Sequence, residues 1–272
     1  MRLDRALVAR GLARSRGRAH DLIDAGSVCV EGAIVTKASA DIRDDQDVVV
    51  LGGRDDYVSR AAHKLLGALN AFQAQGLEVE GRRCLDAGAS TGGFTQVLLE
   101  RGASHVLALD VGHGQMAPVV EDDPRVALRE GINVRDLPPP DGPGVGLIVA
   151  DLSFISLTLV VGALAPWLDP GGDALLLVKP QFEVGAARLK GGIVRDLEQR
   201  AAAVEAVARA AREAGLAIAG VSRSVVSGAD GNVEFFLWGA KTWQAKGAAD
   251  TRPRLDGEAL GSEISREVHR PA

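Results

Sequence analysis

The sequence contains only two cysteines among its 272 residues, Cys29 and Cys84. They lie far apart, each within an apolar run, so they cannot form a structural zinc site by themselves and they do not indicate a disulfide framework. Unpaired cysteines are most often buried as small apolar side chains. We therefore expect both to belong to a hydrophobic core, and we expect no metal site.

The sequence also lacks a long uncharged hydrophobic run. No window of the chain has the roughly 20 consecutive apolar residues that a membrane-spanning helix needs. The first residues, MRLDRALVARG, carry charges throughout and contain no continuous apolar segment of the kind found in signal peptides. We therefore expect no membrane association and a cytoplasmic location.

An excess of positive charge is missing as well, because 31 Lys and Arg residues stand against 36 Asp and Glu residues. This balance argues against nucleic-acid binding by the whole surface. The first twenty residues differ, since their only acidic residue is Asp4. A local basic patch is enough for contacts with RNA phosphates. The arginines of this segment are Arg2, Arg5, Arg10, Arg14, Arg16 and Arg18.

The order of apolar and polar segments divides the chain into two domains. Residues 1–52 read as a small α/β unit of two helices followed by short strands. A polar, glycine-containing linker, 53–60, includes most of the GGRDD segment. Over 61–243, strand-length apolar runs alternate with helical patterns, which predicts a mainly parallel sheet covered on both faces. Residues 244–272 are polar without clear periodicity and are expected to form a flexible tail.

The segment CLDAGASTGGFTQVLLERGA predicts a strand, a tight turn of small residues and a helix. Such a turn lets a ligand approach the backbone at the carboxyl end of a strand. No lysine follows the glycines, so the segment is not a phosphate-binding loop of the G-x-x-x-x-G-K-[ST] type. Asp110, at the end of the next strand, is suited to accept both hydroxyls of a ribose.

These features fit the nucleoside of S-adenosylmethionine better than a pyrophosphate cofactor, and the carboxylate of Asp86 suits its positive charge. The alternative is an ordinary strand–turn–helix with glycines that serve helix packing. The residues expected to bind the cofactor are Asp86, Gly88, Ala89, Ser90, Thr91, Gly92, Gly93, Phe94, Asp110 and Asn133.

Charged residues stand at the ends of two later strands. Asp151 begins the DLSFIS segment, and Lys179 directly follows five apolar residues. A lysine in that position is unusual unless its ammonium group reaches a cleft or a partner. Beside a methyl donor the two residues suggest a catalytic pair, and the alternative is a structural ion pair. Lys64 and Glu234 are similar oddities, each compatible by itself with an ordinary helix-surface or strand-edge position.

A series of motifs carries a resemblance to a known family over residues 1–240. In order they are RLDRALVARGLARSRGRAHDLIDAG, VCVEG, YVSRAAHKL, LDAGASTGGFT, LDVGHGQ, DLSFIS, VKPQFEVG and NVEFF. With these motifs the chain resembles the TlyA, or haemolysin A-like, family of ribosomal RNA 2′-O-methyltransferases. The resemblance implies an S-four-type (alpha-L) RNA-binding domain, then an FtsJ-like, Rossmann-like class I methyltransferase domain with a seven-stranded, mostly parallel sheet.

The resemblance also implies the site and its partners. Lys64, Asp151, Lys179 and Glu234 correspond to a catalytic tetrad, and S-adenosylmethionine to the cofactor. The implied substrate is a cytidine of ribosomal RNA within a ribosomal subunit, of either kind or both. No sequence feature indicates an oligomeric state. The residues that fit the RNA-binding role are Arg2, Arg5, Arg14, Arg16, Arg18 and Lys37.

The expected reaction is in-line transfer of a methyl group to a ribose 2′-hydroxyl, which must be aligned while its proton leaves. We expect Lys179 to be the central group, oriented by Asp151 and Glu234. A lysine held between two carboxylates acts more by positioning the hydroxyl and stabilising alkoxide charge than as a free base. Lys64 would share this work or hold a flanking phosphate.

Three alternatives remain at this stage. DLSF at 151–154 is loosely similar to the [DN]-P-P-[YF] loop of base-amine methyltransferases, but both prolines are absent and the lysines would have no role. An RNA-binding ribosome-assembly factor without catalysis is the second alternative, against which the complete tetrad argues. The third is membrane lysis, which the haemolysin label suggests. The mixed charge of the alanine-rich helix near 200–214 does not support it.

Overall fold

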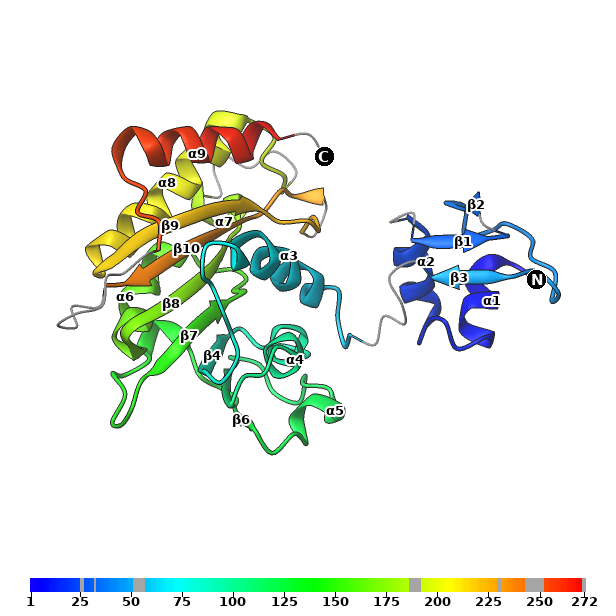
Figure 1. Cartoon of the computed structure of the whole chain (residues 1–272), viewed down its shortest axis with the longest axis horizontal. Coiled ribbons are helices and arrows are strands. Elements are labelled where there is room, and N and C mark those ends of the chain that lie inside the picture. Colours follow the sequence, from blue (N-terminus) through cyan, green and yellow to red (C-terminus); the bar gives the residue numbers. More distant parts are fainter. Residues whose placement is uncertain are drawn as a thin grey trace. The chain divides into compact units, whose positions relative to one another are not determined.

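The computed structural model describes residues 1–24, 27–31, 33–50, 57–185, 192–228, 231–242 and 252–270. The chain divides into two compact units, Met1–Tyr57 and Val58–Ala272, here called the N-terminal and C-terminal units (Figure 1). Residues 53–56 of the linker that we expected over 53–60 lie outside the described residues. The domain limits 1–52 and 61–243 stay our proposal.

The N-terminal unit combines two helices with a small antiparallel sheet in the order β2-β1-β3. Leu3, Ala6 and Leu7 are buried together with strand residues, because they share one face of the first helix. The Ser15 hydroxyl accepts the N–H of Arg18 at 3.2 Å and so caps the start of the second helix. The elements are α1 (Leu3–Ala9), α2 (Arg16–Asp24), β1 (Val28–Val30), β2 (Ala33–Ile34) and β3 (Val48–Val50).

The C-terminal unit is built on a seven-stranded sheet in the order β6-β5-β4-β7-β8-β10-β9 (Figure 1). The five strands from β6 to β8 are parallel, and β10 runs antiparallel to both β8 and β9. The predicted seven-stranded, mostly parallel sheet is therefore confirmed. The strands are β4 (Arg83–Ala87), β5 (His105–Leu109), β6 (Val126–Arg129), β7 (Val145–Ala150), β8 (Leu168–Val178), β9 (Leu216–Arg223) and β10 (Phe235–Lys241).

Helices cover the sheet in two groups. One group pairs α3 with α4, and the other joins α6, α8 and α9 (Figure 1). The central strands are buried at consecutive positions because both of their faces are covered, which explains their continuous apolar sequences. The helices are α3 (Ala61–Gln73), α4 (Gly93–Glu100), α5 (Pro118–Glu121), α6 (Val161–Leu164), α7 (Pro180–Glu183), α8 (Leu197–Glu213) and α9 (Gly257–His269).

The apolar segment between β7 and β8 does not form one continuous helix. It folds as three short turns, namely the 3-10 turn η2 (Leu157–Leu159), the α-helical turn α6 and a second 3-10 turn, η3 (Ala165–Trp167). Pro166 contributes to the break because it has no backbone N–H with which to continue α-helical hydrogen bonding. The site described below depends on the first of these turns.

The C-terminal tail is the part where the sequence prediction was wrong. Residues 257–269 form α9, with Leu260, Ile264 and Val268 buried along one face. This spacing of four residues is the apolar stripe of an amphipathic helix, which packs against α8 and β9. The carboxylate of Glu267 accepts the N–H of Arg223 at 2.9 Å and fixes α9 to the edge strand. Residues 244–251 of the expected tail lie outside the described residues.

The cysteines differ in their surroundings. Cys84 is buried in β4, and burial raises the pKa of its thiol to about 12. Cys29 is half-buried, because alternation along β1 turns Val28 and Val30 toward the core and Cys29 away from it. Among the residues that the structure describes, no helix has the length and apolar character to cross a bilayer. Those residues also contain no group of three or more His, Cys, Asp and Glu side chains arranged to bind a metal ion.

Candidate active site at the carboxyl ends of the strands

The glycine-rich turn between β4 and α4 lies against the turn that follows β7. Gly88 has a φ of +87°, and a Cβ there would lie 2.6 Å from the backbone oxygen of Asp151. Only glycine therefore combines this left-handed backbone with so close an approach. Gly92, with a φ of +91°, precedes α4 and would press a Cβ onto Val120. The turn brings the ends of β4 and β7 together.

Asp86 lies beneath this turn. Its carboxylate is fully buried, and the Thr95 hydroxyl donates a hydrogen bond of 2.7 Å to Oδ2. Burial raises the pKa of Asp86 to about 7, partly offset by the Thr95 hydrogen bond and reinforced by the charge of Asp151. Because Asp86 is absent from the walls of the cavities described below, the geometry supports a role in holding the turn rather than direct cofactor contact.

Replacing Asp86 by asparagine is expected to stabilise the protein more at pH 8 than at pH 5. The unfolded carboxyl ionises near 3.8, but the folded one ionises near 7. Between these two pH values the Asp86 carboxyl is ionised in the unfolded chain but still protonated in the folded one. The free energy of unfolding therefore falls as the pH rises, and above pH 7 the total loss due to Asp86 is about 4 kcal/mol. Asparagine has no such proton, and its amide oxygen still accepts from Thr95. Urea unfolding of both proteins checks this, and an equal difference at the two pH values would contradict it.

Asp110 and Asn133 face a cavity of about 400 Å³, called here the Asp110 cavity. The two carboxylate oxygens of Asp110 accept the N–H groups of Ser90 and Gly112, each at 2.7 Å. Asn133 accepts the N–H of Arg135 at 3.1 Å and begins the 3-10 turn η1 (Val134–Asp136). The rest of the wall is largely apolar and includes Val111, Ile132, Val134, Leu152, Ile155 and Val160. Polar groups at one end of an apolar cavity suit a nucleoside.

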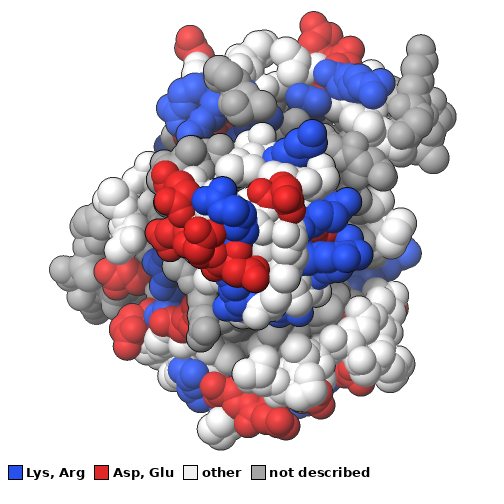
Figure 2. Space-filling model, turned by 90° about the vertical axis from the view of Figure 1, so that its right-hand side faces the viewer, with Lys and Arg blue, Asp and Glu red and all other residues white. Residues whose placement is uncertain are grey.

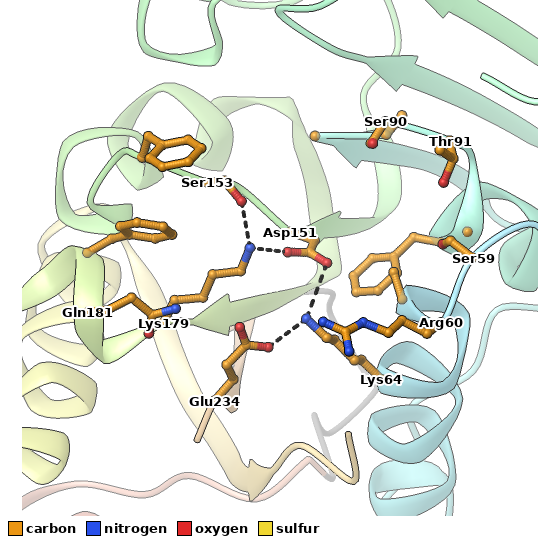
Figure 3. A pocket seen from close by; sticks show the side chains of 17 residues that line it. Ser59, Arg60, Lys64, Ser90, Thr91, Asp151, Ser153, Lys179, Gln181 and Glu234 are labelled. Atoms are coloured by element: carbon orange, nitrogen blue, oxygen red, sulfur yellow. Dashed lines mark hydrogen bonds and ion pairs between the residues drawn. The ribbon is translucent and has the colours of Figure 1, made fainter. Parts of the chain in front are cut away.

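A second cavity, of about 420 Å³, contains all four charged residues of the predicted tetrad (Figure 3). We call it the tetrad cavity. Its wall includes six of the predicted cofactor-binding residues, namely Gly88, Ala89, Ser90, Thr91, Gly93 and Phe94. The two cavities adjoin, because both are lined by Gly88, Ser90, Asp151, Ser153 and Phe154. A ligand at the Asp110 cavity can therefore extend to the tetrad.

The tetrad forms a chain of ion pairs (Figure 3). Lys179 Nζ lies 2.6 Å from Asp151 Oδ1, and Lys64 Nζ lies 2.6 Å from Glu234 Oε2. Asp151 Oδ2 and Lys64 Nζ, 4.0 Å apart, join the two pairs. The side chains are at most 14% exposed, so water screens these charges far less than at the surface. Lys179 also donates a hydrogen bond of 2.9 Å to Ser153 Oγ.

The structure brings the four residues together as predicted but pairs them differently. We expected Lys179 to lie between Asp151 and Glu234, whereas Glu234 pairs with Lys64 and Asp151 alone pairs with Lys179. Glu234 also directly precedes β10 rather than lying inside the strand. Lys64 reaches the site from the first turn of α3. Two lysines of opposite walls thus share one carboxylate, Asp151.

Several site residues were missed by the sequence interpretation, most clearly Phe154 and Phe182. Phe154 is 92% exposed and has a φ of +64°, which is unusual for a residue with a side chain. Its ring lies 5.3 Å from that of Phe182, which in turn lies 5.9 Å from Lys179 Nζ. The only sequence signal was their place inside DLSFIS and VKPQFEVG. The other wall residues that were missed are Ser59, Arg60, Ala61, Ser153 and Gln181.

The arginines of the N-terminal unit do not all have the same surroundings. Asp4 is fully buried and pairs with Arg2 at 3.0 Å and Arg16 at 2.8 Å, which hold the pKa of its carboxyl well below its ordinary value. Part of the hydrogen-bonding capacity of these two side chains is therefore used inside the unit. The predicted RNA-binding residues Arg5, Arg14 and Lys37 are exposed, and Arg18 is half-buried. Figure 2 shows basic and acidic side chains next to one another over the face in view.

Comparison with known proteins covers both units. The family model described as FtsJ-like methyltransferase matches residues 57–241, and the S4 domain model matches residues 1–49. The 16S/23S rRNA (cytidine-2′-O)-methyltransferase TlyA of Mycobacterium tuberculosis is 52% identical over 240 residues, 87% of this chain and 88% of that protein. The 23S rRNA (cytidine-2′-O)-methyltransferase TlyA of Campylobacter jejuni is 33% identical over 260 residues, 88% of this chain and 98% of that protein.

A solved structure shows the same architecture. The "Putative hemolysin from Streptococcus thermophilus" superposes with a TM-score of 0.71 and 34% sequence identity, covering 98% of this chain and 95% of that one. The similarity therefore includes the N-terminal unit, the sheet and the loops that carry the tetrad.

Proposed function

The chain belongs to the TlyA family of FtsJ-like methyltransferases with an S4 domain, and from this premise we propose that it methylates the 2′-hydroxyl of a cytidine in ribosomal RNA, with S-adenosylmethionine as donor. The observation that carries the proposal is the ion-pair chain of Lys64, Asp151, Lys179 and Glu234 beside a nucleoside-sized cavity. These groups suit a hydroxyl nucleophile, because lysines can stabilise the charge that develops on its oxygen.

The residues present fit the proposed donor. The Asp110 carboxylate and the Asn133 side chain face the same cavity, where they are placed to hold the ribose and the base of a nucleoside. Gly88, which lines both cavities, adds no side chain between them, because a Cβ there would lie 2.6 Å from the backbone oxygen of Asp151. When bound, S-adenosylmethionine supplies an electrophilic methyl group.

Lys179 and Asp151 would prepare the acceptor hydroxyl. Asp151 and Ser153 fix the Lys179 ammonium group in one place, so its remaining N–H can donate to the ribose oxygen. That contact aligns the oxygen and stabilises negative charge as the C–O bond forms. An ammonium group has no free lone pair, so the hydroxyl proton passes to a water molecule while the C–O bond forms, which is when the oxygen carries the negative charge that Lys179 stabilises. Lys64, held by Glu234, lies on the other side of Asp151, where it can bind a neighbouring phosphate.

Phe154 offers a platform for the target base. Its exposed ring packs against the ring of Phe182, next to Lys179, and lines both cavities. Aromatic rings stack on unpaired bases, and a ribose can reach an enclosed site only when its nucleotide leaves the helical stack. We propose that the cytosine rests on Phe154 while its 2′-hydroxyl meets Lys179. The exposed Arg5, Arg14 and Lys37 of the N-terminal unit would contact phosphates of the same RNA.

Incubation of the purified protein with each ribosomal subunit and radiolabelled S-adenosylmethionine tests the proposal. We expect one or both subunits to incorporate label at a single cytidine. Alkaline hydrolysis should leave the phosphodiester bond that follows this cytidine uncleaved, because a 2′-O-methyl group removes the attacking hydroxyl. Label on a base nitrogen, with hydrolysis unchanged, would instead support a base-amine methyltransferase. No incorporation into either subunit would support an assembly factor without catalysis.

A further inference from the structure

Glu183, the last residue of α7, connects α7 to the loop that follows β7. Its Oε1 accepts the N–H of Leu157 at 2.9 Å, and its Oε2 accepts a short hydrogen bond from the Ser156 hydroxyl. Ser156 is the residue before the turn η2 and caps it by accepting the N–H of Thr158 at 3.2 Å. One carboxylate therefore holds both the hydroxyl and the backbone at the end of the loop.

The other end of this loop is held by the sheet. The N–H of Asp151 donates to the carbonyl of Ala87 at 3.0 Å, as a continuation of the pairing between β7 and β4. Residues 152–155 thus form a short span between the sheet and the Glu183 contact. Ser153, which accepts from Lys179, and Phe154, which contacts Phe182, both lie within this span.

The span is strained. A non-glycine residue in the left-handed region, such as Phe154 at a φ of +64°, costs about 1–3 kcal/mol and persists only when its surroundings impose it. Phe154 is exposed, so burial of its own side chain does not supply that constraint. The hydrogen bonds that fix the two ends of the span do supply it.

The chemistry of Glu183 also favours a specific task. The carboxyl is partly buried, which raises its pKa, and the two groups that donate to it are neutral. Within the described part of the chain this carboxylate has no cationic partner, and a carboxylate removed from water in that way is costly. Its two oxygens, however, can accept two hydrogen bonds at once, which an aliphatic side chain at this place cannot do.

We propose that Glu183 is a positioning residue for methyl transfer: it holds residues 152–156 in the strained conformation in which Ser153 orients Lys179 and Phe154 receives the base. This inference rests on the proposed function above. Glu183 is not expected to touch the substrate, since its contacts are to the loop. We expect its larger effect on the rate of transfer, because Ser153 orients Lys179, and a smaller effect on cofactor binding, because Leu152 and Ile155 line the Asp110 cavity.

The Glu183→Ala variant is expected to lower kcat by about 10- to 100-fold, because small displacements of positioned groups have effects of this size. The Kd for S-adenosylmethionine should change less than kcat does, by no more than about fivefold, because only one side of the Asp110 cavity belongs to this loop. Glu183→Gln should recover part of the loss, since its amide oxygen can still accept the N–H of Leu157. In a Ser153→Ala background the Glu183→Ala effect should shrink, because both changes act on Lys179.

Glu267→Ala is the matched control, since Glu267 also accepts a backbone N–H, at 2.9 Å, but does so on α9. We expect this variant to lose stability and keep its kcat.

Hydrogen–deuterium exchange provides a readout that does not need activity: amides of 152–157 should exchange faster in Glu183→Ala and not in Glu267→Ala. Failure of the parent protein to methylate either subunit would refute the proposed function, while the exchange result still decides whether Glu183 holds the loop.

The inference would be overturned by a Glu183→Ala variant with unchanged exchange over 152–157. It would equally be overturned by a kcat within twofold of the parent, or by fully additive effects of Glu183→Ala and Ser153→Ala. A loss of kcat that is matched by the Glu267→Ala variant would show general damage to the fold instead of positioning.

Discussion

Replacing Lys179 by alanine is expected to lower kcat for methyl transfer by about a thousand-fold or more, while the affinity for S-adenosylmethionine changes by less than about threefold. The ammonium group is fixed by Asp151 at 2.6 Å and by Ser153 at 2.9 Å, in the cavity that would receive the hydroxyl. Alanine removes both the alignment of that oxygen and the stabilisation of its charge. Single-turnover labelling and calorimetric titration of the cofactor measure the two quantities.

The Lys179→Arg variant separates the possible roles of this lysine. Arginine keeps the positive charge and the N–H donors but cannot serve as a base. If Lys179 positions the hydroxyl and stabilises its charge, Lys179→Arg should recover part of the rate that Lys179→Ala loses. If Lys179 accepts a proton, the two variants should be equally inactive. Near-normal turnover of Lys179→Ala itself would overturn the assignment of this residue.

Replacing Gly88 by alanine is expected to lower the free energy of unfolding by about 2–5 kcal/mol and to weaken S-adenosylmethionine binding at least about tenfold. Alanine would have to keep the backbone φ of +87° at this position, and its Cβ would lie 2.6 Å from the backbone oxygen of Asp151. Relief of that contact requires the ends of β4 and β7 to move apart, which displaces both Asp151 and the turn beside Asp110. Urea unfolding and cofactor titration are the measurements.

Gly76→Ala is the control that isolates the backbone cost. Gly76 has a φ of +95°, and a Cβ there would meet no atom within 4 Å. We expect a loss of about 1–2 kcal/mol and unchanged cofactor affinity. If Gly88→Ala proved no more harmful than Gly76→Ala in both measurements, the close approach of the two strand ends would not be the reason for glycine at position 88.

The sequence by itself determined the sheet and most of the residues of the site. Continuous apolar runs separated by helical patterns are sufficient for a parallel sheet, because strands buried on both faces need apolar residues throughout. Charged residues that directly follow such runs, Asp151 and Lys179, had to lie at the carboxyl edge of that sheet. The tail was the main failure in the fold, since Leu260, Ile264 and Val268 form an apolar stripe that we did not detect among polar residues.

Only the tertiary structure decided how the site residues are paired and which of them line a cavity. Lys64 belongs to α3 and Glu234 to the approach of β10, so their ion pair of 2.6 Å depends on how a helix packs beside a distant strand. The same holds for Asp86, which lies under the turn and not in a cavity wall. Local patterns fix which face or end of an element a residue occupies. Contacts between elements distant in sequence arise from the packing of the whole core, so they appear only in the folded chain.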